Sequence, residues 1–340
     1  GPGSVNVLER RPADRVAEFE QIYRRHYLNY AGAGERYTSI GEVGPMVVIT
    51  YDAFRSAVEP FVDWKNQMGI PTTLVDVSAV GSTATQIKSY IQNLYDTEGL
   101  CFVVLVGDVA QIPYYNNGGA SDPSYGFLAG ADYYPEVFIG RLSAETLAQV
   151  QTQVERSIEY ERDPQIGADW YHQGVGIASS EGSGIGDDNE ADWEHMDNIR
   201  ADLLGFTYTL VDQIYDTNGG NASQVSAALN AGRSIINYCG HGSLTSWGTT
   251  GYSNTHVNAL SNDNMLPFIS SVACNTGEFQ SGTCFGEAWM RATNGGEPTG
   301  AVGFYGSTIS MSWAPPMCAQ DEMIDLLVAG EKRTFGALSV

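Results

Sequence analysis

The segment Ser234-Ile-Ile-Asn-Tyr-Cys-Gly-His-Gly242, followed by Leu266-Pro-Phe-Ile-Ser-Ser-Val-Ala-Cys274, is the most informative part of this chain. Each piece is a short apolar run that ends in small residues, a pattern typical of a buried strand. The carboxyl ends of neighbouring parallel strands meet at one edge of a sheet, where α/β proteins place their sites. The pattern therefore predicts that His241 and Cys274 meet at one edge, the arrangement that a thiol nucleophile and its imidazole partner require.

Strand and helix patterns alternate along the rest of the chain. Apolar runs predict strands at residues 46–50, 73–77, 101–106, 136–141, 174–178, 206–211 and 300–305. Helical spacing of apolar residues predicts helices at 12–30, 53–68, 83–97, 143–162, 190–204, 222–231, 283–293 and 317–329. This alternation is typical of an α/β protein with mostly parallel sheets. A length of 340 residues allows two tandem units that meet near residue 165.

The composition excludes several classes of function. The chain carries 17 Lys and Arg against 40 Asp and Glu, a net charge of -23 with a pI near 4.3. Such acidity argues against nucleic-acid binding through phosphates, and the absence of a GxGxxG or P-loop motif argues against nucleotide enzymes. With a mean hydropathy of -0.18 and no apolar stretch near ~20 residues, we expect a globular protein without a membrane span.

Five cysteines are present, at positions 101, 239, 274, 284 and 318. Their odd number and their spacing fit neither a disulfide framework nor a zinc site. Cys101 and Cys239 lie inside apolar runs, where a buried, inert thiol is the plainer interpretation. Cys274 differs because it stands at a strand end, before Asn275-Thr-Gly277.

A set of segments in order along the chain resembles the gingipain family, cysteine peptidases of the caspase-like clan. The segments are Phe61-Val-Asp-Trp-Lys-Asn-Gln67, Leu105-Val-Gly-Asp108, Glu136-Val-Phe-Ile-Gly-Arg141, Tyr238-Cys-Gly-His-Gly-Ser243, Leu266-Pro-Phe-Ile269, Val272-Ala-Cys274, Ser312-Trp-Ala314 and Lys332-Arg-Thr-Phe-Gly336. One GHG motif would be weak, but an ordered set over some 300 residues is specific. The resemblance implies a caspase-like, three-layer α/β/α fold and a cysteine endopeptidase.

The resemblance also implies catalytic roles. Cys274 would attack the scissile carbonyl, and His241 would serve as acid and base. The backbone N–H groups of Cys274 and Gly242 would form the oxyanion hole, where each donor contributes about 3 kcal/mol to the transition state. Glu181 matches the family position that orients the base; an ordinary loop carboxylate is the alternative for this residue.

A basic residue on the N-terminal side of the scissile bond (P1) is implied by the same resemblance. Asp192 matches the floor of the S1 pocket, where a carboxylate pairs with a guanidinium. Trp313, Met317, Cys239 and Val272 match its walls. Two departures leave Lys open beside Arg: position 239 carries Cys where Arg-specific relatives have Thr, and position 312 carries Ser in place of an aromatic residue.

The N-terminal region resembles the family's junction between propeptide and enzyme. Residues 1–4 look like the scar of an expression tag, and residues 5–36 like a propeptide remnant. The enzyme itself would cleave between Arg36 and Tyr37. The part that follows would consist of a first, calcium-binding subdomain (37–165) and a second, catalytic subdomain (166–340). A flexible linker with an incidental Arg is the alternative interpretation. The family's catalytic domain continues past residues 332–336 with another helix and strand.

Acidic loops suggest structural calcium, since carboxylate and carbonyl oxygens suit that ion. The resemblance implies a first site formed by Asp108, Ala129, Asp132, Tyr134 and Glu136, with Ala129 and Tyr134 contributing carbonyl oxygens. It implies a second, weaker site at residues 190 and 195, where His195 would ligate through its backbone oxygen beside Glu190.

The sequence thus predicts a secreted or cell-surface peptidase, monomeric, a zymogen that binds calcium and its own propeptide. Its substrates would be proteins and peptides with Arg, or Lys, at P1. Three alternatives remain: a Lys-specific or broader peptidase, a catalytically silent binding or adhesion module of the same fold, and a flavodoxin-like cofactor protein.

Overall fold

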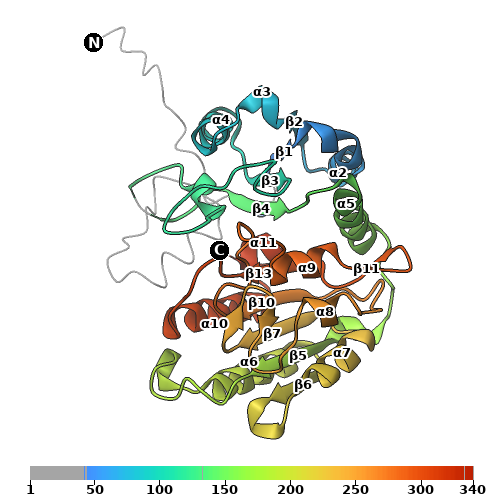
Figure 1. Cartoon of the computed structure of the whole chain (residues 1–340), viewed down its shortest axis with the longest axis vertical. Coiled ribbons are helices and arrows are strands. Elements are labelled where there is room, and N and C mark those ends of the chain that lie inside the picture. Colours follow the sequence, from blue (N-terminus) through green and yellow to red (C-terminus); the bar gives the residue numbers. More distant parts are fainter. Residues whose placement is uncertain (1–41, 43, 132, 333, 340) are drawn as a thin grey trace.

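The computed structural model describes residues 42, 44–131, 133–332 and 334–339. Two parallel sheets follow one another along the chain, each with helices on both faces (Figure 1). The strands of the first sheet are β1 (Met46–Thr50), β2 (Thr72–Asp76), β3 (Phe102–Val106) and β4 (Phe138–Leu142). The strands of the second sheet are β5 (Gln173–Ala178), β6 (Leu210–Tyr215), β7 (Ile235–Cys239), β10 (Phe268–Val272) and β13 (Gly303–Gly306).

The first sheet has the order β2-β1-β3-β4, and β1 at its centre is buried along its whole length. A continuous apolar run such as Met46-Val-Val-Ile is typical of a parallel strand that is covered on both faces. One face packs against α2 (Arg55–Gln67) and α5 (Leu147–Arg162), and the other against α3 (Val77–Val80) and α4 (Ala84–Glu98).

The second sheet has the order β13-β10-β7-β5-β6. One face is covered by α6 (Asp192–Phe206) and α10 (Ala314–Val328), and the other by α7 (Ala222–Asn230), α8 (Asn254–Val257) and α9 (Phe285–Arg291). Two short antiparallel pairs lie outside the two large sheets: β8 (Gly242–Ser243) with β9 (Ser246–Trp247), and β11 (Thr293–Asn294) with β12 (Glu297–Pro298). The last described helix is α11 (Phe335–Leu338). The predicted α/β class with two tandem, mostly parallel sheets is confirmed.

Short 3-10 helices occupy several connections. They are η1 (Asp52–Phe54), η2 (Pro123–Gly126), η3 (Asp169–His172), η4 (Asp187–Asn189) and η5 (Asp216–Asn218).

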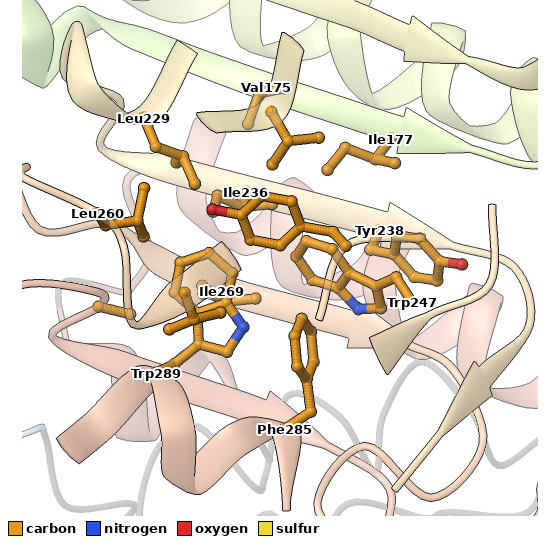
Figure 2. Close-up of a cluster of buried hydrophobic side chains, with 14 of the residues drawn as sticks. Val175, Ile177, Leu229, Ile236, Tyr238, Trp247, Leu260, Ile269, Phe285 and Trp289 are labelled. Atoms are coloured by element: carbon orange, nitrogen blue, oxygen red, sulfur yellow. The ribbon is translucent and has the colours of Figure 1, made fainter. Parts of the chain in front are cut away.

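An aromatic cluster beneath the second sheet supports the end of β7 (Figure 2). Tyr238 and Trp247 stack with ring centroids 4.6 Å apart, and Phe285 meets the edge of Trp247 at 5.0 Å. The Tyr238 hydroxyl donates to the backbone oxygen of His241 at 2.6 Å. All three rings are fully buried, so the backbone of the predicted histidine is attached to a rigid core rather than to a free loop.

Several predicted boundaries were wrong by a few residues. The helix predicted from residue 143 begins at Leu147, because Thr146 and Gln149 form a capping box there. The strand predicted at 206–211 is β6, which begins only at Leu210. The apolar positions Met196, Ile199 and Leu203 continue the helical face of α6, so that helix extends through residue 206 and takes up the start of the run.

The two sheets fall on either side of the predicted boundary at 165, and buried polar contacts join them. The guanidinium of Arg156, on α5, is fully buried and donates to backbone oxygens of Trp289, Ala292 and Ala301 in the second unit. The predicted tag scar, propeptide, helix at 12–30 and cleavage site at Arg36 and Tyr37 lie outside the described residues. Within the described part, no helix is both long enough and apolar enough to pass through a lipid bilayer.

Candidate active site

The predicted nucleophile and base leave adjacent strands at the same edge of the second sheet. Cys239 on β7 pairs with Val272 on β10, and the Gly240 N–H donates to the Val272 oxygen at 3.1 Å. His241 therefore follows β7 and Cys274 follows β10 by the same two residues. The two segments touch beyond the strands, since a Cβ atom on Gly242 would lie 2.6 Å from the Cys274 carbonyl oxygen. Only glycine permits this approach.

The His241 side chain lies at the surface, and its ring is held in place by contacts with Glu181 and Trp313. Its Nε2 atom lies 2.9 Å from Oε2 of Glu181, and its ring meets the Trp313 ring edge-on at 5.2 Å between centroids. Both members of the His–Glu pair are 58% exposed. An ion pair so exposed adds little stability, so its effect is to fix the orientation of the imidazole.

Cys274 is half-buried, and the N–H of Met311 donates to its sulfur at 3.4 Å. The next residue, Asn275, adopts a left-handed backbone with φ of 61°. Its N–H donates to the backbone oxygen of Ile309 at 3.1 Å, so the segment that carries Met311 closes over the thiol from one side. The thiol, the imidazole and the carboxylate of Glu181 thus share one surface.

Behind this surface, Asp192 is fully buried in the first turn of α6. A helix N-terminus stabilises a carboxylate, and both oxygens of Asp192 accept hydrogen bonds, one from Trp313 Nε1 at 2.6 Å and one from the Ser179 hydroxyl. Burial raises the pKa of the Cys239 thiol, and the neighbouring charge and hydrogen bond of Asp192 raise it further. Cys239 is therefore a neutral thiol beside this carboxylate.

The other residues predicted for the S1 pocket gather around Asp192. Val272, Met317 and Trp313 share one apolar cluster with Cys239. Gly182 covers the carboxylate, because a Cβ atom there would lie 2.5 Å from Asp192 Oδ1. The sequence pattern had no signal for Ser179, whose hydroxyl is the second donor to this carboxylate.

The second predicted calcium site brings two carboxylates to one histidine ring. Nδ1 of His195 lies 2.8 Å from Glu190 Oε1 and 3.4 Å from Asp321 Oδ1, and ligation through the His195 backbone oxygen stays a prediction. Asp321 was missed because it lies far along the chain, on α10. Burial, together with nearby carboxylates, raises the pKa of Asp321 to about 7 despite the nearby His195. Two crowded carboxylates are a donor set that a hard cation fits.

The first predicted site is only partly formed by described side chains. Each Asp108 oxygen already has one partner: Oδ1 accepts from the Val109 N–H at 2.6 Å, and Oδ2 pairs with Arg291 at 2.9 Å. The Glu136 carboxylate accepts from the N–H of Ala129 at 2.9 Å. Asp132 lies outside the described residues, and ligation through the Tyr134 carbonyl oxygen stays a prediction.

Comparisons with known proteins agree with this geometry. The sequence profile of Peptidase family C25 matches residues 41–339. Gingipain R2 of Porphyromonas gingivalis is 42% identical over 335 residues, which cover 95% of this chain and 45% of that protein. The chain therefore belongs to peptidase family C25.

Two solved structures share the fold. The crystal structure of the Arg-specific cysteine proteinase gingipain R matches with a TM-score of 0.85 and 42% identity, over 87% of this chain and 71% of that one. A complex of the pro- and mature domains of the Porphyromonas gingivalis protease RgpB matches with a TM-score of 0.84 and 42% identity, over 87% and 72% of the two chains. The predicted caspase-like α/β fold is confirmed. The chain spans between 17% and 45% of the length of the curated relatives that it matches.

Proposed function

We propose that this protein is a cysteine endopeptidase that cleaves after basic residues, with Arg preferred over Lys at P1. One observation carries the proposal. His241, held by Glu181, and Cys274 leave neighbouring strands at one edge, directly in front of the buried carboxylate of Asp192. Membership of a peptidase family supports the chemistry, and the Arg-specific relative supports the preference.

The first half of the reaction would form a thioester. The Cys274 thiol transfers its proton to His241, and the thiolate attacks the carbonyl carbon of the scissile bond. The backbone N–H groups of Cys274 and Gly242 stabilise the oxyanion. When the tetrahedral intermediate collapses, the C–N bond breaks and His241 protonates the departing amine.

The second half would release the acid. His241 takes a proton from a water molecule, which attacks the thioester carbon. The C–S bond then breaks and the thiolate recovers a proton from the imidazole. Throughout both halves, the Glu181 carboxylate on Nε2 holds the ring and stabilises its cation, leaving the other ring nitrogen, Nδ1, for proton exchange.

Selection of a basic side chain would depend on Asp192. A guanidinium that enters beneath Gly182 would take over hydrogen bonds now made by Trp313 and Ser179, and the carboxylate can accept two parallel N–H bonds. The Trp313 indole can stack on the planar group and Met317 can pack against its methylene stem. Both contacts favour Arg over the compact ammonium of Lys.

The test is a set of peptides that differ only at P1, with Arg, Lys or a neutral residue, cleaved by the wild type and by Cys274→Ala. Cleavage after Arg that Cys274→Ala abolishes supports the proposal. Equal or faster cleavage after Lys would favour the Lys-specific or broader peptidase. No cleavage by correctly folded wild type would favour the silent binding or adhesion module.

We also propose that the chain is a secreted or cell-surface zymogen that cleaves itself between Arg36 and Tyr37. Support comes from the family and from the related complex of pro- and mature domains. N-terminal sequencing of incubated protein tests self-cleavage, since it would give a new end at Tyr37. The same end produced in Cys274→Ala would contradict it. Fractionation of producing cells tests the location.

Calcium is the proposed structural ion. Glu190 and Asp321 would supply carboxylate oxygens, in an arrangement that also holds His195, and Glu136 and its loop would supply the first site. A cation would relieve the repulsion between the crowded carboxylates and stabilise the folded chain. Calorimetric titration of chelator-treated protein with calcium measures this directly.

A further inference from the structure

The Ser179 hydroxyl lies where the two halves of the candidate active site meet. Ser179 follows the last residue of β5 and is buried, with its N–H donating to the Cys239 oxygen at 3.0 Å. Its hydroxyl donates to Oδ2 of Asp192, and the Ser179 Oγ atom in turn accepts the N–H of Glu181 at 3.0 Å. One hydroxyl therefore contacts both the residue of the S1 floor and the residue that orients the base.

A hydrogen bond between the backbones of Asp192 and Glu181 links these two residues a second time. The N–H of Asp192 donates to the backbone oxygen of Glu181 at 2.9 Å. Glu181 is thus held on its N–H by Ser179 and on its carbonyl by Asp192, while its side chain reaches His241 at 2.9 Å. Since His241 and Glu181 are largely exposed, the hydrogen bonds from Ser179 and Asp192 supply the rigidity that the surface pair lacks.

We propose that Ser179 is a positioning residue that couples recognition of the P1 side chain to orientation of the catalytic histidine. The inference rests on the proposed function. A guanidinium bound by Asp192 competes for the oxygen that now accepts from Ser179, so binding at P1 acts on the turn that carries Glu181. Ser179 touches neither the scissile bond nor the thiol, and its effect passes through Asp192 and Glu181.

If Ser179 couples P1 recognition to the orientation of His241, its removal should change both kcat and KM. Displacing a catalytic group by about 1 Å can cost on the order of 100-fold in rate, so we expect Ser179→Ala to lower kcat about 10- to 100-fold on an Arg peptide and to raise KM as well. Ser179→Thr keeps the hydroxyl and should recover most of both. Ser180→Ala, at the exposed neighbour, is the matched control and should behave like wild type.

A second measurement does not depend on peptide cleavage. Iodoacetamide carries no P1 side chain, and its reaction at Cys274, followed by peptide mass mapping, reports how readily His241 generates the thiolate. We expect Ser179→Ala to slow this alkylation severalfold at neutral pH, and Ser179→Thr to restore it. Thermal unfolding of each variant separates this effect from loss of the fold.

Two results would overturn the inference. An alkylation rate unchanged by Ser179→Ala would mean that the hydroxyl serves Asp192 alone. Equal losses in Ser179→Ala and Ser179→Thr would mean that the site requires only the packing of serine. If the wild type cleaves no basic peptide, the proposed function fails, yet the alkylation rates still decide whether Ser179 positions the histidine and thiol.

Discussion

Replacing Asp192 by Asn tests the specificity pocket with the smallest possible change. The Asp192 carboxylate is fully buried and accepts from Trp313 and Ser179. Asn has the same shape: its oxygen can still accept from the indole, and its NH₂ can donate to the hydroxyl, which is both donor and acceptor. We therefore expect the variant to fold while losing the charge that a basic P1 side chain requires.

The magnitude follows from the burial of this carboxylate. Truncating one partner of a buried, hydrogen-bonded charge pair costs about 2–5 kcal/mol, which corresponds to a loss of roughly 30- to 4000-fold in kcat/KM at about 1.4 kcal/mol per decade. The loss should appear with Arg at P1 and be far smaller for a peptide with a neutral P1 residue, because the catalytic pair is unchanged.

The assay measures initial rates on peptides that are identical except at P1, normalised by titration of the reactive thiol. Asp202→Asn removes the same charge from an exposed position of the same helix and serves as the control. An Arg-to-neutral preference that is unchanged in Asp192→Asn would refute the assignment of this residue to the pocket, and with it the reasoning from buried charge.

Three further predictions concern the orientation of His241 by Glu181, the second calcium site, and the contacts of Arg156 between the two sheets. Glu181→Gln should lower kcat about 10- to 100-fold in steady-state kinetics, and an unchanged kcat would make this carboxylate an ordinary surface group. EDTA should lower the melting temperature of the wild type and of Asp325→Asn by similar amounts, and that of Asp321→Asn by less, because this variant keeps only the first site; equal shifts in all three would contradict the second site. Arg156→Leu should reduce the free energy of unfolding by about 1–3 kcal/mol in chemical denaturation, because it leaves the buried Ala301 oxygen without its donor and removes one hydrogen bond each from the Trp289 and Ala292 oxygens. A change within about 0.5 kcal/mol, as expected of surface substitutions, would show that these contacts do not hold the two sheets together.

Much of the fold could be predicted because its signals are local. Short apolar runs alternate with helical patterns, and the runs at β7 and β10 are long enough and apolar enough to be read as buried parallel strands. The boundary errors have a physical cause. Phe206 opens the run at 206–211 but is the last residue of α6, and periodicity alone could not say which element takes it.

The proposed catalytic pair, His241 and Cys274, could be placed at one edge of the sheet because each residue follows a strand and a small-residue turn. What the sequence could not give is contact between distant elements. Asp321 joins Glu190 and His195 only because α10 packs beside α6. The pairing of Asp108 with Arg291, which is distant in sequence and lies on α9 of the other unit, could not be read from the sequence for the same reason.

We propose that one thiol at the edge of the second sheet reacts with substrates that present a guanidinium. The most direct measurement treats the protein with a peptidyl chloromethyl ketone carrying Arg at P1 and identifies the modified residue by mass spectrometry, beside a matched reagent with a neutral P1 residue. We predict rapid, single modification at Cys274 by the Arg reagent, with much slower modification by the neutral one. Modification at Cys318 or another cysteine instead would show that Cys274 is not the reactive thiol. Equal rates with both reagents would show that the site does not select a guanidinium.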